Sequence, residues 1–250
     1  MFIPPFFVQP SLNKMHDLMR TYPFAVLISA DPTGSVDAQH LPVTLNTGKN
    51  PYGAMFLHVA AANPVAQRLC SHRPVTVVFT GAHAYISPDW YESDGKVPTW
   101  NFMAVHAQGC PQRVDDQKLM EGLEDLTAHS EAGLEKVPWD VAGLDPVAYE
   151  KLRGGIVGFS IEIERLEGKW KVGQNHSVAD RRSAAAGLRH VGGSSRLEIA
   201  EAMIATADKE SMFRSVARTD VVGFGLRSVS LATPPAHKTV AFYVPTVMPL

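Results

Sequence analysis

The chain has 250 residues, of which 45% are hydrophobic and 19% are charged, so it can bury a globular core and does not belong to the disordered class. Its formal net charge of -2 provides no overall positive field of the kind that attracts nucleic acid or anionic membranes. The two cysteines, Cys70 and Cys110, have no C-x-x-C spacing and cannot form a disulfide framework, so we expect a reducing, cytoplasmic environment.

The N-terminal third begins with an apolar segment, residues 1–10, that has no basic region and is interrupted by prolines. Neither a signal peptide nor a membrane span is therefore predicted there. An amphipathic helix capped by Ser11 should follow. Strands are expected over residues 23–30, 36–45 and 54–59, the first two as an antiparallel hairpin. Asn63 and Pro64 suit the start of a short helix, which would leave directly from the end of the third strand.

The middle of the chain returns to strand patterns over residues 75–81 and 102–114. Between them lies the aromatic-rich segment "GAHAYISPDWYESDGKVPTWNF", Gly81–Phe102, which we expect to be mostly loop. The clearest amphipathic helix covers residues 115–131, with an apolar stripe of Leu119, Met120, Leu123 and Leu126. Alternation resumes over residues 155–172, and helices are predicted over residues 178–190 and 195–208. Many strands without βαβ alternation predict a mainly β protein of the α+β class, with an antiparallel barrel and peripheral helices.

Common catalytic signatures are missing from the sequence, including G-x-S-x-G, H-E-x-x-H, a P-loop and a G-x-G-x-x-G after a strand. His58, His83 and His106 lie on separate strand patterns without metal-ligand spacing, so no metal site is predicted. The corner at residues 58–64 offers backbone amides and the Asn63 side chain to a phosphate. The same residues also serve simply to begin a helix, and the sequence leaves both interpretations open.

Six motifs carry a resemblance to a known family. They are "QHLP" (39–42), "HVAAANP" (58–64), "GAHAYISPDWY" (81–91), "VPTWNFMAVHAQG" (97–109), "IVGFSIEI" (156–163) and "EGKWKVGQN" (167–175). Over about residues 1–208 the chain resembles the PaiB-type family, described as FMN-binding negative transcriptional regulators on the flavin-reductase-like split barrel. The resemblance implies a split-barrel domain over residues 1–175 and a helical segment over 176–210. Residues 211–250 lie outside it, and strand-like alternation from residue 220 onward suggests an edge hairpin or a surface segment.

The resemblance also implies a homodimer that holds FMN in a cleft between its subunits. Trp90, Tyr91 and Trp100 would be walls of that cleft, and Tyr85 and Ser87 would present hydroxyls to a small-molecule ligand. Catalytic roles are assigned to His83, Tyr85 and His58. The implied cofactor-binding residues are Gln39, His40, Leu41, His58, Ala60, Ala62, Asn63, Ser87, Trp100, Lys169, Trp170, Lys171, Gln174 and Asn175.

Two positions depart from the family pattern: Ala61 stands where arginine is common, and Gly173 where serine is common. A missing arginine removes a charge-assisted phosphate contact of about 2 kcal/mol or more, so retention of FMN stays open, with Arg68, Lys169 and Lys171 as possible replacements. A flavin-dependent oxidoreductase acting on a small molecule is the first hypothesis.

Two other functions remain open. One is a regulator, as the family description says, although the net charge and the absence of a helix-turn-helix signature argue against direct binding to nucleic acid. The arginine-rich run at residues 179–190 is more typical of a solvated helix face. The other is a flavin-free enzyme or binding protein that uses the same cleft, with acid-base work by His58, His83, His106 or Tyr85.

Overall fold

The computed structural model describes residues 1–48, 50–139 and 143–222. Residues Met1–Ser211 form one compact unit, and all the strands described below belong to it. The helices are α1 Leu12–Thr21, α2 Pro64–Leu69, α3 Asp116–Glu131, α4 Pro146–Gly154, α5 Val178–Val191 and α6 Ser194–Val222, with 3₁₀ turns η1 Pro5–Phe7 and η2 Pro88–Trp90. The strands are β1 Phe24–Ala30, β2 Val36–Pro42, β3 Thr44–Asn46, β4 Ala54–Ala60, β5 Val75–Ile86, β6 Thr99–Gly109, β7 Pro111–Arg113, β8 Ile156–Glu162 and β9 Arg165–Lys171.

The strands make two antiparallel sheets. Sheet A has the order β2-β1-β5-β6-β9, and sheet B has the order β3-β4-β8-β7. Only Val43 separates β2 from β3, only Cys110 separates β6 from β7, and only Ile163 and Glu164 separate β8 from β9, so the chain passes directly from one sheet to the other at these three corners. This arrangement confirms the predicted α+β class and the antiparallel split barrel.

The core lies between the two sheets, and strand alternation explains why these residues enter it. In β4, Met55, Leu57 and Val59 are buried, while the residues between them are less so. Phe79 of β5 and Phe159 of β8 are buried in the same cluster. Because side chains of a strand alternate between the faces of a sheet, one face of each sheet is apolar and the other is available for helices or ligands.

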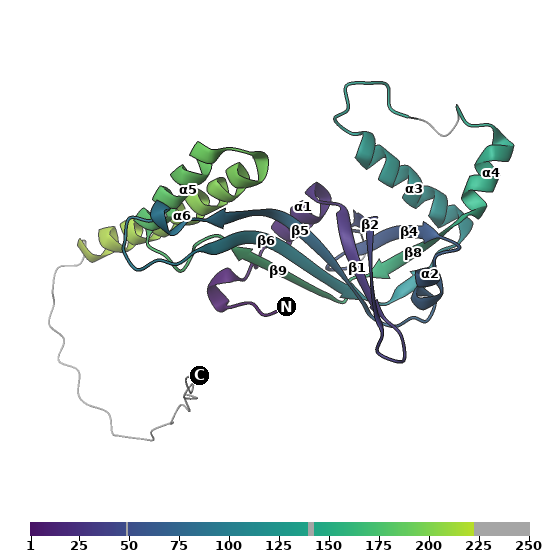
Figure 1. The fold of residues 1–250 in the computed structure, drawn as a ribbon, viewed down its shortest axis with the longest axis horizontal. Coiled ribbons are helices and arrows are strands. Elements are labelled where there is room, and N and C mark those ends of the chain that lie inside the picture. The colour runs from purple at the N-terminus through teal and green to yellow at the C-terminus, as the bar shows by residue number, and fades with distance from the viewer. Residues whose placement is uncertain (49, 140–142, 223–250) are drawn as a thin grey trace, which may run out of the picture. The chain divides into compact units, whose positions relative to one another are not determined.

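The hairpin of β5 and β6 is longer than the sequence predicts. β5 continues to Ile86 and β6 begins at Thr99, so the aromatic-rich segment is mostly strand and only its middle is a loop. The strand register shifts between Thr80 and His83, where β5 contains an irregularity of the β-bulge type. Figure 1 shows α5 and α6 beside the far ends of β5 and β6, and α3 above β4 and β8.

The helix α3 differs in detail from its predicted stripe. Leu119 and Gly122 are buried against sheet B, whereas Met120, Leu123 and Leu126 are only half-buried. Gly122 allows α3 to approach sheet B closely, because a Cβ at this position would lie 2.4 Å from the Phe56 ring. The expected apolar stripe is therefore wrong in its centre, since a glycine rather than a leucine makes the closest contact with the sheet.

The C-terminal part of the described chain is helical. α6 runs to Val222, well beyond the predicted end at residue 208. The strand-like alternation expected from residue 220 onward falls mostly on residues 223–250, which lie outside the described part of the chain. Of the helices that the structure describes, none combines the length and apolar character needed to cross a bilayer.

Candidate functional site

The outward face of sheet A, away from the core, gathers several of the predicted site residues. Strand register places Tyr85 opposite Trp100 and places Phe102 between His83 and Lys171. Because alternate residues share a face, these side chains lie on one surface together with Lys169. We call this surface the hairpin face and define it as His83, Tyr85, Trp100, Phe102, Lys169 and Lys171.

Two large aromatic side chains of the hairpin face are open to solvent. Trp100 is 56% exposed and Tyr85 is 43% exposed, and their ring centroids are 6.1 Å apart with the rings steeply inclined. The His83 ring lies 6.2 Å from the Trp100 ring. Exposed aromatic groups clustered in this way are typical of a surface that binds a ligand or another protein.

The two lysines of the hairpin face project beside these rings. The Lys171 ammonium donates to the Trp100 carbonyl oxygen at 2.8 Å and to the Thr99 hydroxyl. Lys169 lies over the Phe102 ring at 5.3 Å and donates to the Phe2 carbonyl oxygen. Burial, with a smaller effect from the nearby Lys169 charge, lowers the pKa of Lys171. An anion bound between the two ammonium groups would relieve that repulsion.

Helix α6 fixes the position of the hairpin face through Ser195. The His83 amide donates to Ser195 Oγ at 2.9 Å, and Ser195 Oγ donates back to the His83 carbonyl oxygen at 2.8 Å. These bonds satisfy backbone groups of β5 just after its register shift. Sequence reasoning did not identify Ser195, because its partner is 112 positions away and no local pattern marks it.

The loop between β5 and β6 is anchored on α5 by a buried carboxylate. Asp180, only 1% exposed, accepts from the Glu92 and Ser93 amides at 3.1 and 3.0 Å and pairs with the Lys96 ammonium at 3.1 Å. Burial acts to raise the pKa of the Asp180 carboxyl, but the hydrogen bonds outweigh it and leave this pKa well below its usual range.

Trp90 and Tyr91 pack within their own chain. A Cβ on Gly187 of α5 would lie 2.6 Å from the Trp90 ring, so the indole rests directly on that helix. The Tyr91 ring lies 4.9 Å from the His176 ring. Of the three aromatic residues assigned to a cleft wall, Trp100 is the one that this chain leaves exposed.

At the strand-to-helix corner, residues 58–64, most hydrogen-bond donors already bond to other groups of the same chain. Asn63 Oδ1 accepts from the Val65 amide at 3.0 Å as the cap of α2, and Asn63 Nδ2 donates to Gln39 Oε1 at 3.3 Å. The Ala61 amide is bonded to the Gly155 carbonyl oxygen. The structure therefore favours the interpretation of this corner as a helix start over that of a phosphate site within one chain.

Arg68 does not compensate for Ala61 in this chain. Its guanidinium lies 3.6 Å from the Asp31 carboxylate and donates to the Ser35 carbonyl oxygen at 3.2 Å, which holds it at the turn between β1 and β2. The other departure, Gly173, has a φ of +83°, a backbone conformation that favours glycine over serine.

The remaining predicted residues occupy several places. His40 lies on the outward face of sheet A, 6.2 Å from the Phe24 ring, whereas Leu41 and Trp170 pack against the core. Ala60 and Ala62 are exposed at the corner after β4. The remaining polar groups bond locally: Ser87 Oγ accepts from the Asp89 amide, Gln174 bonds the Val172 amide and the Trp170 carbonyl oxygen, and Asn175 bonds His176.

His58 is separated from the other two residues assigned catalytic roles. It lies opposite Gly158 in sheet B, where α3 packs, while His83 and Tyr85 belong to sheet A. Burial lowers the pKa of His58, and its Nδ1 atom is buried without a hydrogen-bond partner among the described residues. The catalytic roles of all three stay predictions, but only His83 and Tyr85 share a surface.

Metal and nucleic-acid chemistry find little support in the described ranges. Within residues 1–48, 50–139 and 143–222, no three or more His, Cys, Asp or Glu side chains are grouped to hold a metal. In the arginine-rich run of α5, Arg181 is only 2% exposed and Arg182 pairs with Asp208 at 2.9 Å. The run is therefore not a continuous basic face for binding nucleic acid.

Comparisons with known proteins agree with this fold. Residues 1–165 match the family described as "Putative FMN-binding domain". Protease synthase and sporulation protein PAI 2 of Bacillus subtilis is 32% identical over 181 residues, covering 72% of this chain and 85% of the relative. An uncharacterized protein of Emericella nidulans is 28% identical over 231 residues, covering 77% of this chain and 92% of the relative. Among solved structures, the flavocytochrome Anf3 of Azotobacter vinelandii aligns with a TM-score of 0.52 at 14% identity, covering 66% of this chain and 69% of that one.

Proposed function

Because the chain belongs to the FMN-binding domain family, we propose that it binds FMN on the hairpin face and acts as a flavin-dependent oxidoreductase on a small molecule. The observation that carries this proposal is the grouping of two exposed aromatic rings with two lysines on one surface. A flavin needs a flat apolar contact for its ring system and cationic donors for its phosphate, and these residue types provide both.

Each residue of the hairpin face has a distinct role in the proposal. Trp100 and Tyr85 would pack against the flavin ring system, and Lys169 and Lys171 would hold the phosphate. When bound, FMN supplies the redox chemistry of the site. His83 and Tyr85, both on the hairpin face, would hold or move a proton for a substrate. The position of His83 depends on its two hydrogen bonds to Ser195.

A second copy of the chain would complete this site. The corner residues Ala60 and Ala62 lie at the end of β4 of sheet B and just after it, whereas the hairpin face lies on the outward side of sheet A. Phe24 of β1, 67% exposed, is a further exposed aromatic side chain of sheet A. An exposed apolar surface of this kind favours burial against a partner subunit, so we propose a homodimer that brings the corner of one copy to the hairpin face of the other.

The phosphate assignment predicts a large loss of affinity when both lysines are replaced. The double variant Lys169→Met and Lys171→Met keeps the aliphatic stems but removes two charge-assisted contacts. We expect the Kd for FMN to rise about 100-fold, from two contacts of about 1.5 kcal/mol each. The measurement is titration of the purified protein with FMN, followed by flavin fluorescence and visible absorbance.

Lys151→Met is the matched control, because Lys151 is exposed on α4 and does not belong to the hairpin face. Unchanged FMN binding is expected for this variant. If the wild-type protein shows no saturable change with FMN, the proposed function is wrong. If it binds FMN and the double variant binds equally well, the phosphate lies elsewhere.

The dimer arrangement predicts that Ala61→Arg tightens FMN binding. Ala61 is exposed directly after β4, so an arginine there has space, and it would add one bidentate phosphate contact. We expect the Kd to fall about tenfold. Gln67→Arg, exposed on α2, adds the same charge nearby and should have little effect. Equal Kd values for the two variants, or a monomer by light scattering, would contradict the shared site.

A further inference from the structure

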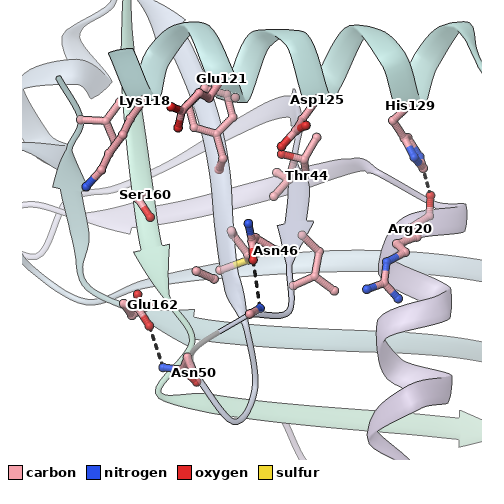
Figure 2. A pocket seen from close by; sticks show the side chains of 18 residues that line it. Arg20, Thr44, Asn46, Asn50, Lys118, Glu121, Asp125, His129, Ser160 and Glu162 are labelled. Atoms are coloured by element: carbon pink, nitrogen blue, oxygen red, sulfur yellow. Dashed lines mark hydrogen bonds between the residues drawn. The ribbon is translucent and has the colours of Figure 1, made fainter. Parts of the chain in front are cut away.

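A cavity lies apart from the hairpin face, between α3 and the outward face of sheet B. Its volume is about 700 Å³, within the range of about 300–1,000 Å³ typical of small-molecule sites. Figure 2 shows Lys118, Glu121, Asp125 and His129 along α3, above Thr44, Asn46 and Ser160 of the strands. This cavity shares no residue with the hairpin face.

The cavity exists because α3 touches the sheet along only part of its width. Gly122 lets the helix contact Phe56. Beside that contact, polar side chains of α3 face the strands across the cavity. Lys118, Glu121, Asp125 and His129 are spaced three or four positions apart and so line one side of the helix. The floor combines the Phe56 ring with the polar side chains of the strands, which gives an apolar body and a polar rim to the site.

Most charged groups of the cavity already have partners. Glu121 accepts from Gln117 at 3.0 Å, and Glu162 accepts from Asn50 at 2.8 Å. His129 Nε2 bonds the Arg20 carbonyl oxygen at 2.9 Å, and the Arg20 guanidinium is 3.4 Å from the Thr47 hydroxyl and 3.9 Å from Asp17.

Two charges in this cavity are left without a partner. Among the residues that the structure describes, neither the Lys118 ammonium nor the Asp125 carboxylate makes a hydrogen bond or an ion pair. The two groups have opposite signs and both border the cavity. A ligand that satisfied them both would have to carry one charge of each sign.

From this geometry we propose that the cavity binds a zwitterionic ligand of dipeptide size. Lys118 and Asp125 are seven positions apart, about 10 Å along the helix axis, a span that a dipeptide with one charged contact of about 3 Å at each end can bridge. The ligand's ammonium pairs with Asp125, its carboxylate pairs with Lys118, and an apolar side chain contacts Phe56. This site is independent of the flavin proposal and stands whether or not FMN binds.

The dipeptide Gly-Phe and two capped forms of it test the proposal. Gly-Phe carries both charges, its C-terminal amide carries only the ammonium, and its N-acetyl form carries only the carboxylate. Exposed ion pairs contribute modestly, so we expect each cap to weaken binding about three- to tenfold. Isothermal titration calorimetry with the full chain measures all three affinities.

Two variants assign each charge to its partner. Asp125→Asn should weaken Gly-Phe as much as acetylation does and should not weaken the acetylated form further. Lys118→Met should match the amide in the same way. Both side chains are exposed, so neither change should unfold the protein. This pattern of non-additive losses is expected only when the groups interact directly.

Glu124→Gln is the control, because Glu124 lies on the same helix but borders the apolar groove toward α4. It should bind Gly-Phe as the wild type does. No binding of Gly-Phe at about 10 mM, a concentration that detects very weak complexes, would overturn the proposal. Equal affinity of all three peptides, or losses in the two variants that simply add to those of the caps, would overturn it as well.

Discussion

Replacing Asp180 with alanine should lower the free energy of unfolding by about 3 kcal/mol. The carboxylate is buried at the start of α5 and accepts hydrogen bonds from Ser93, while its partner Lys96 is mostly buried. Its removal leaves two amides of the loop without an acceptor and leaves His176 Nδ1, 3.3 Å away, as the remaining partner of the Lys96 ammonium, which costs more than the lost attraction alone. Urea unfolding followed by tryptophan fluorescence measures the difference.

The matched control is Asp94→Ala in the same loop, because Asp94 is exposed. We expect a change within about 0.5 kcal/mol for this control. If both variants have the same stability, the loop is not anchored by Asp180. Loss of the Asp180 hydrogen bonds should also broaden the fluorescence emission band of Trp90, because the Trp90 ring packs on the same helix, α5.

The effect of Asp180 should depend on pH in one direction. Because its pKa in the folded protein is lowered, its stabilising contribution is present above the ordinary aspartate pKa of about 3.9 and is lost as pH falls below it. The stability gap between the wild type and Asp180→Asn should therefore be widest near neutral pH and shrink in acid. A gap that stays constant down to about pH 3 would contradict this account.

The second large effect is expected at Gly109, where β6 turns toward β7. A Cβ at this position would lie 2.0 Å from the Glu162 carbonyl oxygen and 2.9 Å from the Ile161 side chain. Backbone atoms of a central strand cannot move aside as a flexible side chain can, so Gly109→Ala should cost about 3 kcal/mol or prevent soluble folding. Thermal unfolding and the soluble yield measure the result.

Gly154→Ala is the control for this substitution. Gly154 ends α4, and a Cβ there would have no neighbour within 4 Å, so alanine should leave stability unchanged or slightly raised. A melting temperature for Gly109→Ala within about 2 °C of the wild type would show that the barrel corner has more freedom than the structure indicates.

Local sequence signals predicted most of the elements correctly. The alternation over β4 needs only the period of a strand, and the Asn63 and Pro64 start of α2 needs only groups within one helical turn. The helix α4 was missed because its nine residues follow prolines and glycine and carry no clear apolar stripe. The prediction that the strands close into a split barrel came from the family resemblance, because strand patterns alone do not determine how strands pair.

The candidate site was only partly predictable, as two tryptophans illustrate. Trp90 and Trp100 stand in one aromatic-rich segment, yet α5 supports the first, while the second remains exposed. Likewise, nothing near Ser195 or Asp180 in the sequence indicates that one holds His83 and the other holds the neighbouring loop.

Sequence alone determined the strands, the helix caps and the residue types available for flavin chemistry, because these depend on backbone hydrogen bonds and side-chain periods between near neighbours. Only the tertiary structure decided which of those residues share a surface, which charges are already paired and where a cavity remains. These properties arise when segments about a hundred positions apart come into contact, and such contacts leave no local pattern in the chain.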